Sequence, residues 1–144
     1  DNIVLLPDTI LTLPSGIDLF QEVKIKLNEN KFAFLFKQEV EEKMLSTKGS
    51  LELDNELRVI DYEDKPTKNL SRFHGYWCGF AFKKEVFDAS ISFMEQSTLK
   101  TQKPTKKINQ TSIFNSKVIK VEDFKDLGTW KEIGKILSDQ SSND

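Results

Sequence analysis

The segment Arg72–Phe82 constrains the fold more than any other part of the chain. It reads Arg-Phe-His-Gly-Tyr-Trp-Cys-Gly-Phe-Ala-Phe and holds five aromatic residues together with the single histidine and the single cysteine. In a strand, alternate side chains point to opposite faces: Phe73, Trp77 and Ala81 to one, and Tyr76, Cys78, Phe80 and Phe82 to the other. Because both faces carry large apolar groups, the segment predicts a strand that is buried on both sides and anchors the core.

The length and charge of the chain favour one soluble domain with no general attraction to nucleic acid. A chain of 144 residues is long enough for one compact core and short for two. Its formal net charge of -2 means that any binding to nucleic acid must come from a local patch. We predict a single globular β-rich domain over 1–138, interrupted by a mobile basic loop at about 96–110, and a polar tail over 139–144.

Cysteine usage and glycosylation motifs point to different compartments. A single Cys excludes an internal disulfide and an all-Cys metal site, which favours the reducing environment of the cytoplasm or nucleus. Secretion is the alternative, since the chain begins at Asp1 without Met and carries two N-glycosylation sequons, at Asn69 and Asn109. The sequence shows no signal peptide and no apolar run long enough to span a membrane, so no membrane insertion is expected.

Alternating apolar residues predict several short strands. Val23, Ile25 and Leu27 alternate with lysines, and after Asn28-Glu29-Asn30 the residues Phe32, Phe34 and Phe36 alternate in the same way, which is typical of a hairpin. Further strands are predicted at 3–6, at 51–62 as a strand pair or one bent strand around Asp54-Asn55, at 87–93 and at 113–121. The residues 38–45 fit either a helical turn or a continuing strand.

The end of the chain has helical spacing instead. The residues Thr129-Trp130-Lys131-Glu132 fit a capping box, in which the Thr hydroxyl and the Glu carboxylate satisfy free N–H groups. Together these patterns predict a mostly β (α+β) fold: a small antiparallel β-barrel or sandwich, OB-like in one version, with a C-terminal amphipathic helix.

No segment of the sequence carries a catalytic or metal-binding motif. His74 and Cys78 would lie about 13 Å apart along one strand, too far for a nucleophile and its base. The acidic residues at 39–42 and 61–64 have no apolar surroundings that would shift their pKa, so they are interpreted as a solvated face. Gly75 and Gly79 lack the following helix of a phosphate-binding loop. We therefore predict no enzyme, no catalytic residue, no metal and no cofactor.

Two segments remain as candidate binding sites. The basic loop offers contacts to an anion or to nucleic acid through Lys100, Lys103, Lys106 and Lys107. The terminal helix offers an apolar face to a protein partner, in a hetero- or homo-oligomer, through Phe124, Leu127, Trp130, Ile133 and Leu137.

These features lead to three functional hypotheses. The first is a non-catalytic accessory or scaffolding subunit that binds a protein partner within a nucleic-acid-processing assembly. The alternative is a secreted ligand-binding β-barrel glycoprotein, with Tyr76 and Trp77 lining a cavity and glycans at Asn69 and Asn109. The third is an OB-like module that binds single-stranded nucleic acid.

Overall fold

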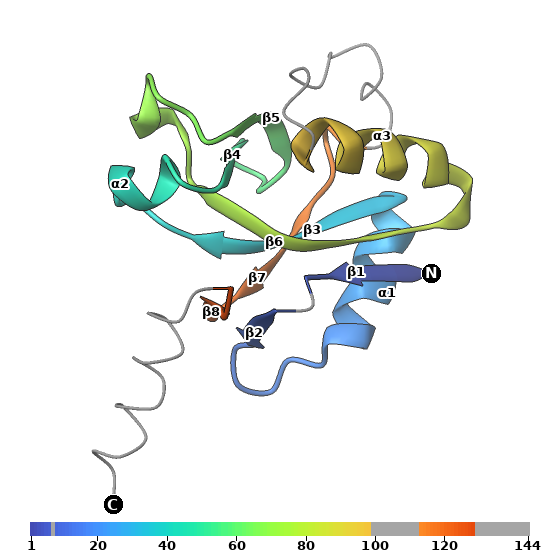
Figure 1. Cartoon of the computed structure of the whole chain (residues 1–144). Helices are drawn as coiled ribbons and strands as arrows, with labels where there is room; N and C mark the ends of the chain where they lie inside the picture. Colours follow the sequence, from blue (N-terminus) through green and yellow to red (C-terminus); the bar gives the residue numbers. More distant parts are fainter. Residues whose placement is uncertain (7, 99–112, 129–144) are drawn as a thin grey trace, which may run out of the picture.

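Two antiparallel strands, β3 (Phe32–Gln38) and β6 (Gly75–Phe82), form the centre of the structure (Figure 1). They pair along their whole length, from Phe32 opposite Phe82 to Gln38 opposite Gly75. The computed structural model describes residues 1–6, 8–98 and 113–128. Every residue of β6 except Trp77 is buried, and its side chains contribute to clusters on both faces of the sheet. The predicted central strand, buried on both faces, is therefore confirmed.

Four more strands complete this sheet, and two others form a separate ribbon. The sheet strands are β1 (Asn2–Leu5), β4 (Gly49–Leu53), β5 (Val59–Asp64) and β7 (Val118–Val121). Their order is β5-β4-β6-β3-β7, with β1 also paired to β6, and β7 runs parallel to β3 while the other pairs are antiparallel. The ribbon consists of β2 (Thr9–Thr12) and β8 (Asp123–Asp126).

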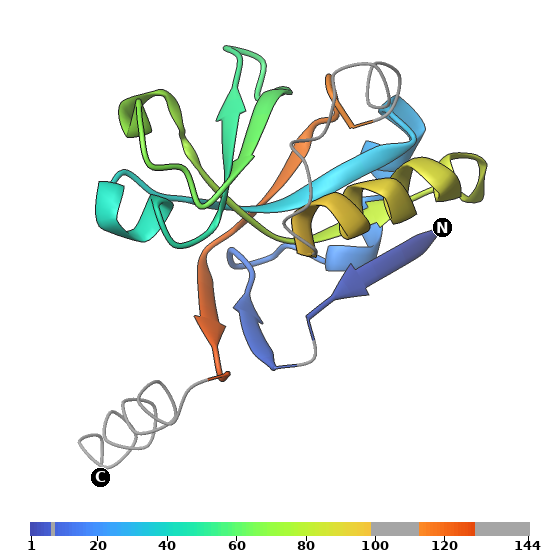
Figure 2. The ribbon, with the colours of Figure 1, turned by 45° about the horizontal axis from the view of Figure 1, so that its top comes forward.

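Helices cover both faces of the sheet (Figures 1 and 2). The longer helices are α1 (Leu19–Glu29) and α3 (Phe87–Thr98), and the short ones are α2 (Glu42–Leu45), η1 (Leu70–Arg72) and η2 (Lys84–Val86). In Figure 1, α1 lies below the central strands β3 and β6, whereas α3 and the β4–β5 end of the sheet lie above them. The predicted antiparallel barrel or sandwich, and its OB-like version, are therefore wrong: the structure is a mixed α+β fold with an open six-stranded sheet.

The first predicted hairpin is wrong because its first strand is a helix. The alternation at Val23, Ile25 and Leu27 also fits a helix whose buried positions are four residues apart, and Val23 and Leu27 are buried while Ile25 is 49% exposed. Asp18 caps this helix, since its Oδ1 accepts the Gln21 N–H at 2.9 Å. Alternation over five residues is too short to distinguish the two periods.

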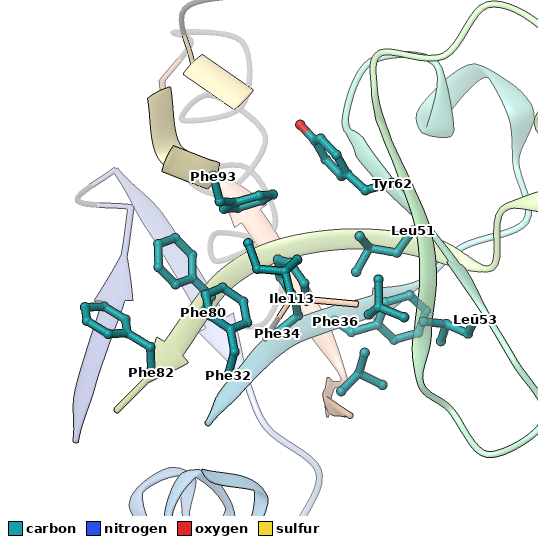
Figure 3. Packing of buried hydrophobic residues seen from close by; sticks show 12 residues of the cluster. Phe32, Phe34, Phe36, Leu51, Leu53, Tyr62, Phe80, Phe82, Phe93 and Ile113 are labelled. Carbon is teal, nitrogen blue, oxygen red and sulfur yellow. The ribbon is translucent and has the colours of Figure 1, made fainter. Parts of the chain in front are cut away.

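The strand predicted at 87–93 is helix α3, for the same reason. Ser90 and Phe93 are buried, three residues apart, while Phe87 and Ile91 are exposed, which is the helical period and not the strand period. Phe93 lies over the sheet with its ring edge-on to Phe34 and Trp77, at centroid distances of 5.3 and 5.4 Å (Figure 3). These two helices shield the two faces of the sheet, so it has no need to close into a barrel.

Phenylalanines gather on one face of the sheet, and aliphatic residues with Ala33, Cys78 and Ala81 on the other. The upper face holds a cluster rich in phenylalanine, which Figure 3 shows beneath α3 and the β4–β5 hairpin. On the lower face, Ala33, Cys78 and Ala81 allow Val23 and Leu27 of α1 to approach the strands closely. The side-chain volumes of β3 and β6 thus match the elements that cover each face.

A bulge in β6 changes which side chains share a face. Leu35 pairs with Gly79 and Phe36 with Trp77, so Cys78 is left without a partner in the register. Trp77 therefore joins Phe80 in the upper cluster, and Cys78 joins Ala81 in the lower one. The predicted division of faces by strict alternation is wrong at this point.

The predicted strand pair around Asp54-Asn55 is confirmed as the β4–β5 hairpin. Asp54 forms its turn: Oδ1 accepts the N–H groups of Glu56 and Arg58, each at 2.9 Å, and Oδ2 accepts Arg58 Nε at 2.8 Å. The uncertain segment 38–45 contains the short helix α2.

Candidate functional site

The parallel strands β3 and β7 end at the same edge of the sheet, where polar residues from distant parts of the chain meet. Phe36 and Lys37 of β3 pair with Lys120 and Val121 of β7, and β8 follows directly. In open sheets with parallel strands, ligands bind outside these carboxyl ends. We therefore take this edge as the candidate site.

Two aspartates converge beside Gly128. The Leu127 N–H donates to the backbone oxygen of Asp8 at 2.6 Å, and the Gly128 N–H donates to Asp126 Oδ1 at 2.9 Å. A Cβ atom on Gly128 would lie 3.0 Å from both Asp126 Oδ1 and Asp8 Oδ2. Because Gly128 has no side chain, both carboxylate oxygens can lie close to the position that a Cβ atom would occupy.

Lys48, directly before β4, brings a positive charge to this pair. Its Nζ lies 3.4 Å from Asp126 Oδ2 and 5.5 Å from the centre of the Phe124 ring. Its backbone is held on both sides, because its N–H donates to Leu45 O at 3.3 Å and its carbonyl accepts the Lys65 N–H at 2.9 Å. Lys65, in the left-handed conformation at φ 49, lies at the same edge.

Tyr76 and Phe124 form the apolar floor of the site. Their ring centroids are 5.9 Å apart in an edge-on arrangement, and Tyr76 is buried. Burial raises the pKa of the Tyr76 phenol well above its ordinary value, and Cys78, Glu39 and Asp123 raise it further. The Tyr76 hydroxyl therefore stays protonated at neutral pH.

The charged groups at this edge are the carboxylates of Asp8 and Asp126 and the ammonium group of Lys48. Mg²⁺ prefers oxygen ligands and is commonly held by one or two carboxylates together with the phosphates of a substrate. Within residues 1–6, 8–98 and 113–128, no cluster of three or more His, Cys, Asp or Glu side chains could hold a metal alone. Asp8 and Asp126 would therefore need ligand or water oxygens to complete the coordination.

Arg72 holds the segment between β5 and β6 against the hairpin. Its guanidinium donates to Glu52 Oε2 at 2.7 Å, to Asp61 Oδ2 and to Glu63 Oε2 at 3.0 Å. Burial lowers the pKa of Arg72, but the bonds to Asp61, Glu52 and Glu63 outweigh it, so the net shift is upward. This cluster supports the loop that begins at Lys65.

The structure places only some of the predicted site residues. Phe124 lies in strand β8 and Leu127 just after it, so neither belongs to the predicted helix. Asn69 is exposed, in a left-handed conformation before η1, and its glycosylation stays a prediction. Outside the described residues lie Lys100, Lys103, Lys106, Lys107, Asn109, Trp130, Ile133 and Leu137.

His74 and Cys78 have separate positions. His74 Nδ1 accepts the Leu53 N–H at 3.2 Å, so the imidazole continues the bonding between β6 and β4. The Cys78 thiol is fully buried and donates to Leu35 O at 3.4 Å. Burial raises the pKa of this thiol to about 12, which disfavours the nucleophilic thiolate.

Sequence reasoning missed Asp8, Lys48 and Asp126. The one available signal was Asp8, which follows the apolar strand of residues 3–6, because an acidic residue at the end of a strand is well placed for a ligand. Nothing in the sequence near Lys48 or Asp126 shows that these residues meet.

Comparison with known proteins identifies the fold. No family model and no curated protein matches the chain. Among solved structures, UTP-bound UGPase from Acinetobacter baumannii has a TM-score of 0.66 at 13% identity, covering 100% of this chain and 52% of that one. A protein assigned as glucose-1-phosphate thymidylyltransferase from Bacillus anthracis, in complex with sucrose, has a TM-score of 0.56 at 16% identity, covering 92% and 51%.

A third structure, HddC from Yersinia pseudotuberculosis complexed with GMP-PN, has a TM-score of 0.56 at 16% identity and covers 92% of this chain and 52% of that one. The chain thus spans about half the length of each of these structures. At these identities the likeness shows the fold alone: the chain shares the fold of about half of each of these structures.

This fold overturns the functional hypotheses drawn from the sequence. Three hypotheses are wrong: the accessory or scaffolding subunit, the secreted β-barrel and the OB-like module. The prediction that the chain is not an enzyme is wrong as well. The prediction of no enzyme was based on motifs within single segments. Asp8, Lys48 and Asp126, by contrast, meet only in the folded chain. Among the described residues, no helix is long and apolar enough to cross a membrane.

Proposed function

We propose that this chain forms the cation- and phosphate-binding part of a nucleotidyltransferase-type active site. The observation that carries the proposal is the convergence of Asp8 and Asp126 on the space beside Gly128, with Lys48 next to them, at the edge where parallel strands end. Support comes from the fold, since similar structures were solved with UTP or GMP-PN.

Each residue has a role that follows from its chemistry. Asp8 and Asp126 supply carboxylate oxygens to a divalent cation, and Lys48 supplies an ammonium group to the phosphates of a nucleotide or sugar phosphate. The cation, when bound, would neutralise and orient those phosphates. Phe124 and Tyr76 hold Lys48 and β8 in place beneath the site.

Calorimetric titration of the protein with UTP and with glucose 1-phosphate, each in the presence of Mg²⁺, tests the proposal. Asp126→Asn and Asp8→Asn should each weaken binding about tenfold or more, since each removes a charged ligand of the cation. Asp88→Asn, an exposed carboxylate on α3 at the far end of β6, is the matched control and should change nothing. Equal binding by all four proteins would refute the proposal.

The proposal also includes a compartment. An intracellular location, favoured by the single cysteine, agrees with a nucleotide ligand, and fractionation of native cells with an antibody checks it. A protein partner at Phe124 and Leu127, and nucleic acid at the lysines between 100 and 107, stay predictions from the sequence. A pull-down from native extract addresses the first of these.

A further inference from the structure

We draw no further inference here: the strongest candidate, the apolar surface patch that Phe87 and Ile91 leave exposed on the outer face of helix α3, carries none because nothing in the structure shows what covers it.

Discussion

The β4–β5 hairpin and the β2–β8 ribbon both bring residues to the candidate site, but they are held in different ways. The hairpin joins strands that are close in sequence, and buries Leu51, Leu53 and Val59 in the upper cluster. The ribbon pairs residues 9–12 with residues 123–126, and Ile10 is 43% exposed. The hairpin is thus part of the core, whereas the ribbon forms only when two segments far apart in the sequence pair.

The two elements therefore differ in what they contribute to the candidate site. Lys48 lies directly before the first strand of the hairpin. Asp126 lies in the ribbon and Asp8 directly before it, and no residue of either ribbon strand is buried. Elements with few buried apolar contacts open more easily than core elements. We therefore expect changes in the hairpin to affect stability first, and changes in the ribbon to affect binding first.

The largest expected effect comes from truncating the core side of the hairpin. Leu51 is fully buried, so Leu51→Ala should lower the free energy of unfolding by about 2 to 5 kcal/mol, through lost burial and a cavity. Leu11→Ala, in the half-buried ribbon, should cost about 1 kcal/mol while weakening Mn²⁺ binding. Urea unfolding followed by circular dichroism measures both, and equal costs would show that the ribbon belongs to the same core.

Two glycines provide a closer comparison. A Cβ atom on Gly49 of the hairpin would lie 2.1 Å from Trp77 Nε1, and Trp77 is packed against Phe93 and Phe80. Gly49→Ala should therefore destabilise the fold by about 1 to 3 kcal/mol. Gly128→Ala should change stability by less than about 0.5 kcal/mol but fill the space between Asp8 and Asp126.

Thermal unfolding and Mn²⁺ titration together distinguish the two glycine variants. The comparison fails if Gly128→Ala binds Mn²⁺ as the wild type does, because the added methyl group would then lie outside the cation site.

A smaller change in stability than that of Leu51→Ala is expected on the charged surface of the hairpin. Arg72→Met removes the bonds to Glu52, Asp61 and Glu63 and should cost about 1 to 2 kcal/mol, since the side chain is 29% exposed. The pKa of Arg72 is raised above an already alkaline value, so its contribution is present below that value and is lost only at still higher pH.

The cost of Arg72→Met should therefore be the same in urea unfolding at pH 7 and at pH 9. A cost that disappears at pH 9 would mean that a group other than Arg72 is responsible for the stabilisation.

The sequence predicted those parts of the fold that depend on local pattern and on strong burial. The central strand β6 was recognisable because apolar residues on both parities leave no face for water. The β4–β5 pair was recognisable because its turn lies between two short apolar segments. The helices α1 and α3 were mistaken for strands, since alternation over a few residues fits a helix with buried positions three or four apart.

By itself, then, the sequence determined the buried centre of the sheet and the hairpin beside it, because burial and turns act over short distances along the chain. Only the tertiary structure decided the face of Trp77, through the bulge at Cys78, and the meeting of Asp8, Lys48 and Asp126 at one edge. These residues are separated by tens of positions in the sequence. Their proximity depends on β7 adding parallel to β3 and on β8 returning to β2, and no local pattern encodes either pairing.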